Sequence, residues 1–224
     1  MSISFPTELP VIQDQAIDAR DVFDRDTVNH AMTVLHDDGI YRHLRFRAPD
    51  SGLGWYELVT SPGMLTIAGD HGTHTFRRAE DMFWFFNGWA SNGDTLSTTR
   101  NQINAGYWAE KVEAGTTRAF DTDAYNNAIT AEFLDAAADL TDEEKGNLWS
   151  EVDEYLLGAE TLDNGYENLS NWDNDLMPLT DFHEIELDTW DWHYLWNCWA
   201  IVSGIARYAA ATGAALPETA AASA

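Results

Sequence analysis

Residues 40–77 alternate apolar and polar side chains in short runs separated by turns rich in glycine, proline and aspartate. In the run 40–47, a strand would point Leu44 and Phe46 to one side and Arg45 and Arg47 to the other. Three similar runs follow, "GWYELVT", "MLTIAG" and "THTFR". Short connections favour antiparallel neighbours. The segment therefore predicts a small antiparallel sheet of about four strands over residues 40–77.

Helical patterns flank this segment. Residues 1–20 are expected to form an extended arm, and "DVFDRDTVNHAMTVLHDDG" a short helix ending near Gly39. Further helices are predicted from about residue 79, within 101–114 and 121–140, and after a capping box of Thr141 and Glu144. The last helix, from about residue 192 to 211, is apolar nearly all round, so the other helices should pack around it.

The domain organisation follows from length and composition. A chain of 224 residues without a recognisable linker predicts one domain over residues 1–224. Residues 162–182 are expected to form a polar loop, and residues 212–224 a disordered tail. The predicted fold class is α+β, with the small sheet packed against a helical majority.

The formal net charge of −26, from 38 acidic and 12 basic residues, would strain a compact chain at ordinary ionic strength. At molar salt the Debye length falls to about 3 Å, which removes most of the repulsion. We therefore expect a halophilic protein, from an extreme halophile or its virus. The alternative is an acidic surface that imitates a phosphate backbone, although such ionic attraction weakens steeply with salt. Direct binding of nucleic acid is not expected.

Known motifs give little support for catalysis or a cofactor. The chain has no complete dinucleotide-binding or Walker pattern and no nucleophile elbow. The single cysteine, Cys198, lies in an apolar run and is expected to be buried and inert. No secretion signal opens the chain, and its longest apolar run is too short for a bilayer. These features predict a cytoplasmic protein without a membrane segment or cofactor.

Histidines raise two further possibilities. His71 and His74, with Asp70 and either His36 or His43, could together ligate a metal, but solvent-facing or structural histidines are favoured and no metal is predicted. In the last helix, His193 and Asn197 lie one turn apart and could form a catalytic pair. A satisfied polar contact inside the core is the favoured interpretation of that pair. The acidic loop 163–175 does not match a calcium-binding pattern.

Arginines cluster in the predicted sheet, which holds half of the ten in the chain: Arg42, Arg45, Arg47, Arg77 and Arg78. They either pair with the protein's own carboxylates or receive an anionic partner, since the guanidinium fork suits phosphate and carboxylate. The candidate binding residues are Arg45, Arg47, Arg77 and Asp70, which belongs to the turn "GDHGT".

Four segments, "YRHLRF", "SPGMLTIAGDHGTHTFRRAEDMFWFF", "NAGYWAEK" and "WHYLWNCWAIVSGIARY", lie in this order between residues 41 and 208. Together they resemble a family of uncharacterised accessory proteins of tailed phages and prophages. The family pattern has Met and Tyr where this chain has His71 and His74, which weakens a chemical role for both. The resemblance brings no activity, cofactor or catalytic residue.

These observations predict an accessory protein encoded by a virus or mobile element, which acts in the host cytoplasm as a binding or inhibitor module. Its partner would be a host or viral protein, or an anionic small ligand. One alternative is an enzyme acting on a nucleotide or another phosphorylated small molecule, with Asp70 or a histidine moving a proton. Such an enzyme should gather Arg45, Arg47, Asp70 and a histidine around one cleft, whereas a binding module should present them on an open surface. A second alternative is a structural component of the virion.

Overall fold

The computed structural model describes residues 4–9, 15–87, 103–179 and 187–213. They form two compact units where the sequence analysis expected one domain. The sheet unit comprises the described residues of 14–117 and 190–224, and the helical unit those of 1–13 and 118–189. Both helices and strands are present, which confirms the α+β class. The predicted tail over 212–224 falls almost wholly outside the described residues.

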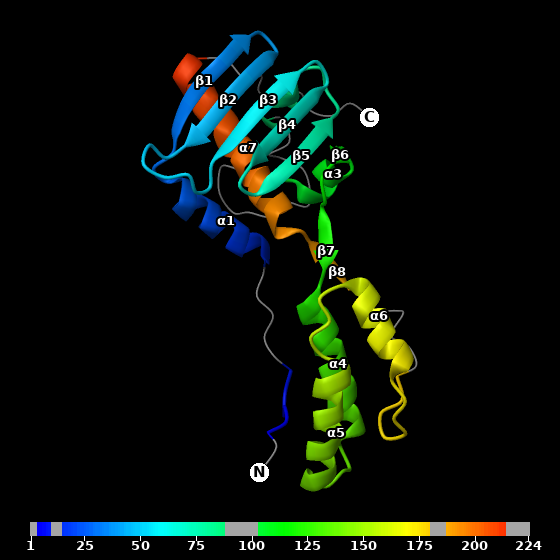
Figure 1. Ribbon diagram of the computed structural model, residues 1–224. Coiled ribbons are helices and arrows are strands. Elements are labelled where there is room, and N and C mark those ends of the chain that lie inside the picture. The colour runs from blue at the N-terminus through cyan, green and yellow to red at the C-terminus, as the bar shows by residue number, and fades with distance from the viewer. Residues whose placement is uncertain (1–3, 10–14, 88–102, 180–186, 214–224) are drawn as a thin grey trace. The chain divides into compact units, whose positions relative to one another are not determined.

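The sheet unit contains six strands, each antiparallel to its neighbour and arranged in sequence order. Figure 1 labels them: β1 (Ala31–Asp38), β2 (Tyr41–Arg47), β3 (Tyr56–Ser61), β4 (Met64–Gly69), β5 (Gly72–Arg77) and β6 (Val112–Ala114). The prediction of about four strands over 40–77 therefore located β2 to β5 and missed the two edge strands. A register shift between Val34 and His36 interrupts the pairing of β1 with β2.

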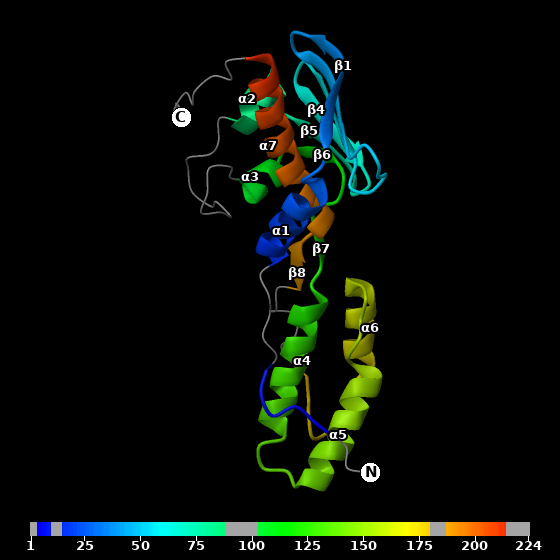
Figure 2. The ribbon, with the colours of Figure 1, turned by 90° about the vertical axis from the view of Figure 1, so that its left-hand side faces the viewer.

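One face of the sheet carries the helices of this unit. α7 (Trp192–Thr212) crosses that face, and α2 (Met82–Asn87) and α3 (Ala105–Ala109) lie on the same side (Figure 2). α1 (Gln15–Thr27) packs along α7. Alternate strand residues point toward α7 and are fully buried, among them Leu44, Phe46, Tyr56, Leu58, Leu65, Ile67 and Phe76.

At Gly204, α7 approaches the sheet closely. A Cβ atom at this position would lie 2.7 Å from a methyl carbon of Leu58 and 3.1 Å from the ring of Phe46. The missing side chain therefore allows the helix to rest directly on β2 and β3. The prediction that the last helix would be the packing centre is confirmed for this unit, because α1 and α2 both contact it.

The helical unit has its own core. It contains α4 (Thr122–Ala136), α5 (Asp142–Tyr155), α6 (Leu162–Asn171) and the strand pair β7 (Arg118–Phe120) with β8 (Asp188–Trp190), the last residue of which belongs to the sheet unit. The predicted helix over 121–140 and the capping box of Thr141 and Glu144 are both confirmed. Tyr125, Ile129 and Phe133 of α4 are buried together with Leu148 and Val152 of α5.

Near the N-terminus, two segments differ in structure from the prediction: residues 31–38 and residues 15–20. Residues 31–38 form a strand, not a helix, because α1 ends at Thr27, whose hydroxyl donates to the carbonyl of Phe23 at 2.8 Å. Gly39 has φ of +63° and makes the turn into β2 instead of ending a helix. Residues 15–20, expected in the arm, are the first turns of α1.

Two further segments were also predicted incorrectly. The helix expected within 101–114 is only the five-residue α3, after which the chain becomes extended in β6 and pairs with β5. The expected polar loop 162–182 begins instead with α6. Thr161 caps that helix by accepting a hydrogen bond from the amide of Asn164, which is a helix start signal.

Substituting Gly204→Ala should lower the free energy of unfolding by about 1 to 3 kcal/mol, because the added methyl group overpacks the contact with Leu58 and Phe46. The matched control is Gly106→Ala in α3, where a Cβ would meet no atom within 4 Å. That control should be neutral or stabilising by up to about 1 kcal/mol. Urea unfolding followed by far-UV circular dichroism measures both; equal effects would contradict the close approach of α7.

Raising the salt concentration should increase the free energy of unfolding. With 38 acidic and 12 basic residues, fewer than one carboxylate in three can have a cation of its own. Between about 0.1 M and about 1 M KCl the Debye length shortens from about 10 Å to about 3 Å, which weakens the repulsion among the rest. Urea titrations at the two concentrations test this, with NaCl expected to act like KCl. An unchanged or lower stability in high salt would refute the expectation.

Candidate functional site

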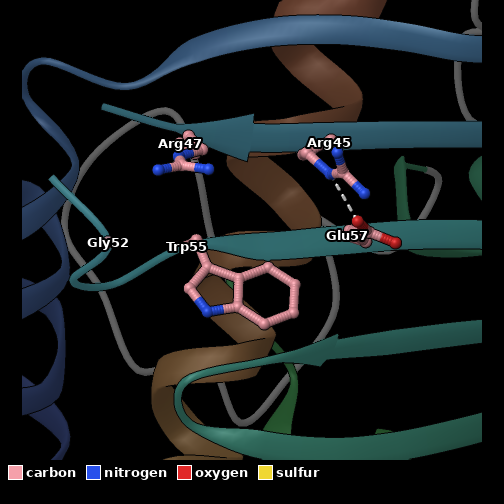
Figure 3. Close-up of a pocket in the computed structure, with 5 residues that line it drawn as sticks. All are labelled: Arg45, Arg47, Gly52, Trp55 and Glu57. Carbon is pink, nitrogen blue, oxygen red and sulfur yellow. Dashed lines mark hydrogen bonds and ion pairs between the residues drawn. The ribbon is translucent and has the colours of Figure 1, made fainter. Parts of the chain in front are cut away.

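The face of the sheet turned away from α7, here called the outer face, carries a pocket of about 320 Å³. Its lining residues are Arg45 and Arg47 of β2, Glu57 of β3, and Gly52 and Trp55 of the connection between these strands (Figure 3). Strand alternation explains the composition, since Leu44, Phe46 and Leu58 point to the buried face and their neighbours point outward. The predicted division of residues 44–47 between two sides is thereby confirmed.

Glu57 lies at the centre of a polar network on this face. It stands directly across from Arg45 in the β2–β3 register. One carboxylate oxygen accepts a hydrogen bond from Nε of Arg45 at 2.5 Å, and the other lies 2.6 Å from Nε2 of His43. Only 16% of the Glu57 side chain is exposed, so its partners hold it in one orientation. The network in turn fixes the guanidinium plane of Arg45.

The environment also shifts the pKa of Glu57 below its ordinary value of 4.5. Burial opposes ionisation, but the hydrogen bonds from His43 and Arg45 favour the carboxylate and outweigh it. A depressed pKa in the folded state stabilises the fold above the unfolded pKa, and this stabilisation is lost as the pH falls through the folded value. Glu57 is therefore ionised at neutral pH and neutralises part of the charge of Arg45.

Arg47 differs from Arg45 because it makes no ion pair with any of the residues that the structure describes. Its exposed guanidinium group faces the same space as that of Arg45 (Figure 3). Beneath the two arginines in this view, the indole ring of Trp55 is seen face-on, and the residue is partly exposed. The pocket thus combines a cation without a described partner, an oriented cation and a flat aromatic surface.

Asp70 contributes to this pocket by positioning its wall. Its side chain accepts a hydrogen bond from the amide of Gly54 at 2.6 Å, and its own amide donates to the carbonyl of Trp55 at 3.1 Å. At Gly69 a Cβ would lie 2.2 Å from that same carbonyl oxygen, so only glycine permits the approach. Asp70 does not line the pocket; the "GDHGT" turn instead holds the segment that presents Trp55.

The remaining arginines of the predicted cluster lie elsewhere. Arg77, on β5, forms an exposed ion pair of 3.0 Å with Glu113 of β6. Arg42 is buried on the opposite face, where its two terminal nitrogens donate to both oxygens of Asp81 at 2.9 and 3.0 Å. Of the four candidate binding residues, the structure thus brings together Arg45 and Arg47, and separates Arg77 from them. Pairing with internal carboxylates accounts for Arg42, Arg45 and Arg77.

His71 and His74, from the same turn, both serve the interior. Nε2 of His74 lies 2.9 Å from the carbonyl of Thr116, and Nδ1 lies 2.9 Å from the amide nitrogen of Asn197. Because a carbonyl only accepts, Nε2 carries the proton and Nδ1 accepts from Asn197. That amide also donates to the carbonyl of His71. Asn197 therefore makes the structural polar contact that the sequence favoured, but with the turn and not with His193.

Two other titratable groups are explained by burial. The His71 ring lies against His193 and Trp196, and burial together with the nearby His193 lowers its pKa. Cys198 is fully buried, as expected, and burial raises the pKa of its thiol. Within the described residues, no three side chains of histidine, cysteine, aspartate or glutamate are grouped to hold a metal ion.

The sequence analysis missed Trp55 and Glu57 as pocket residues. Both belong to the outward-facing set of β3 and its approach, which alternation alone could indicate. Their position beside Arg45 depends on the β2–β3 register across an eight-residue connection, and periodicity does not set that register. A search for a carboxylate and an aromatic residue on the neighbouring predicted strand would have named both.

The substitution Glu57→Gln should lower the free energy of unfolding at pH 7 by about 1 kcal/mol, because it removes the shared ionic partner of Arg45 and His43. The matched control is Glu113→Gln, whose pair with Arg77 has both side chains more than half exposed and should cost less than about 0.5 kcal/mol. The difference from wild type should shrink below about pH 4.5, as Glu57 itself becomes protonated. Urea titrations over this pH range measure it, and equal costs for both variants would refute the network.

Among the described residues no helix has both the length and the apolar character that crossing a membrane requires. Comparison with protein-family models, with curated proteins and with solved structures found no match to this chain.

Proposed function

We propose that this protein is a binding module that contacts its partner through the outer face of the sheet, at the pocket formed by Arg45, Arg47 and Trp55. The observation that carries the proposal is the exposed guanidinium group of Arg47, which has no ion-pair partner among the described residues. It stands beside an oriented arginine and a partly exposed indole. Tryptophan and arginine are the residue types that most often dominate binding energy in protein interfaces.

The local charge of this pocket supports a binding role. The chain as a whole carries a formal charge of −26, so its carboxylates far outnumber its arginines. Three arginines of the same sheet unit, Arg42, Arg45 and Arg77, are each paired with a carboxylate. Arg47 and Arg78 make no ion pair with the described residues, and of these two only Arg47 lines the pocket, which is consistent with a partner that supplies the missing negative group there.

An enzyme is less well supported by the geometry. A catalytic cleft was expected to gather Arg45, Arg47, Asp70 and a histidine. The pocket contains the two arginines, while Asp70 is engaged with Gly54 outside it and both oxygens of Glu57 are occupied. Glu57 is already shared between Arg45 and His43, and Asp70 does not line the pocket, so neither carboxylate is well placed to move a proton to a substrate there.

The biological setting of the proposal rests on the sequence. The resemblance to accessory proteins of tailed phages, together with the strongly acidic composition, leads us to propose a virus- or mobile-element-encoded factor of a halophilic host. Its partner would then be a protein of the host or of the virus, met in the cytoplasm. A virion component is the competing proposal, which co-purification with virus particles would favour.

Reversing the charge at the pocket should abolish partner binding. Immobilised wild-type protein and the variant Arg47→Glu are incubated with lysate of the cells in which the chain is naturally expressed. A component that wild type retains should be reduced about tenfold or more by Arg47→Glu, because both the attraction and the hydrogen bonds are lost.

The matched control is Arg78→Glu, which makes the same change of net charge at another exposed arginine that does not line the pocket. Circular dichroism must first show that both variants are folded. Retention of every component by Arg47→Glu at the level seen with Arg78→Glu would refute the proposed contact surface.

A further inference from the structure

The chemistry of the pocket also limits what can occupy it, provided that the proposed function holds. We infer that the pocket receives the C-terminal residue of a protein partner, with its terminal carboxylate on the two arginines and an aromatic or large apolar side chain on Trp55. Charge, hydrogen-bonding geometry and size each bear on this inference.

The charge of the lining fits one negative charge. Two guanidinium groups, Arg45 and Arg47, stand against the single carboxylate of Glu57, so one positive charge is left over. A carboxylate carries one negative charge, whereas a phosphate monoester carries about 1.5 to 2 at neutral pH. In a chain with a formal charge of −26, the second charge of a phosphate would be repelled without compensation.

The hydrogen-bonding geometry leaves donors for a planar acceptor. Arg45 donates to Glu57 through Nε, and the two terminal nitrogens of Arg45 have no partner among the residues that the structure describes. The guanidinium of Arg47 is likewise available on the pocket side (Figure 3). Pairs of such nitrogens match the two oxygens of a carboxylate. The pocket thus offers the guanidinium group of Arg45, oriented by Glu57, beside that of Arg47, which has no ion-pair partner among the described residues.

The volume and the indole ring favour a compact ligand. At about 320 Å³ the pocket lies at the lower end of the range for small-molecule sites, so it accommodates a group about the size of one residue. In a C-terminal residue, the carboxylate and the side chain branch from the same carbon atom. Within an extended chain, neighbouring side chains point to opposite faces, so an internal acidic residue and the residue next to it would not reach Arg47 and Trp55 together.

A nucleic-acid strand is disfavoured by the same observations. Proteins bind single strands through many phosphate contacts along a basic groove, with bases stacked on aromatic rings. Arg45 and Arg47 are the only basic residues among those that line this pocket, and the acidic Glu57 stands directly across from Arg45. The aromatic ring alone therefore does not make this face a nucleic-acid surface.

Four small probes test the inference by NMR on the full chain, followed at the indole N–H of Trp55 and at Nε–H of Arg45. The first probe, N-acetyl-glycyl-phenylalanine, carries the terminal carboxylate. The second, N-acetyl-glycyl-phenylalaninamide, has an amide in its place. N-acetyl-aspartyl-phenylalaninamide moves the carboxylate to a side chain, and phenyl phosphate replaces it by a dianion. We expect saturable shifts with the first probe and about tenfold weaker binding of the other three.

Variants locate the binding to this pocket. Arg47→Gln should weaken binding of N-acetyl-glycyl-phenylalanine about tenfold or more, whereas the matched control Arg78→Gln should leave it unchanged. Tighter binding of phenyl phosphate would overturn the inference in favour of a phosphate ligand. Equal or tighter binding of the aspartyl probe would overturn it in favour of an internal acidic residue. The absence of saturable shifts with every probe would also overturn it.

The outcomes separate this inference from the proposed function. If Arg47→Glu loses the partner from lysate but no carboxylate probe binds, the outer face is a contact surface and the C-terminal ligand is wrong. If the lysate partner is also retained by Arg47→Glu, the contact surface itself is refuted.

Discussion

The close packing of α7 against the sheet is the contact on which the rest of the sheet unit depends. Gly204 lets the helix backbone rest on Leu58 and Phe46, and this contact buries one face of β2 and β3. Strand residues alternate between the two faces, so burying that set turns their neighbours outward. The positions of Arg45, Arg47 and Glu57 on one exposed face therefore follow from the contact beneath them.

Periodicity predicted the parts of the fold in which hydrophobic burial repeats at a single interval. β2 to β5 and α4, α5 and α7 were located in this way, since each buries one face or nearly all of its surface. β1 was mistaken for a helix because it is an edge strand with nearly all of its residues exposed. Its sequence therefore lacks the alternation of apolar and polar residues that marks a half-buried strand. β6 has three residues and pairs with β5 more than 30 positions earlier, so no local pattern marks it.

The candidate site was predicted in part. Alternation correctly placed Arg45 and Arg47 on one side, and a tight turn was expected at Asp70. The roles of Asp70 and of Trp55 could not be derived, because they depend on the approach of Gly69 to the carbonyl of Trp55, two segments that meet only in the folded sheet. The prediction that Arg77 and Arg45 converge is wrong for a related reason. The position of Arg77 at the end of β5 does not determine how far it lies from Arg45 across the sheet.

The irregular pairing of β1 has a consequence for how the molecule can associate with others. An open sheet edge is a template on which foreign strands add, and such addition leads to aggregation. The register shift between Val34 and His36 interrupts the row of backbone donors and acceptors, and Asp37 and Asp38 end the strand with negative charge. A strand arriving at this edge would meet a break in its hydrogen-bonding ladder, and an acidic one would also meet like charge. The β1 edge of the sheet is thereby made less open to extension by a further strand.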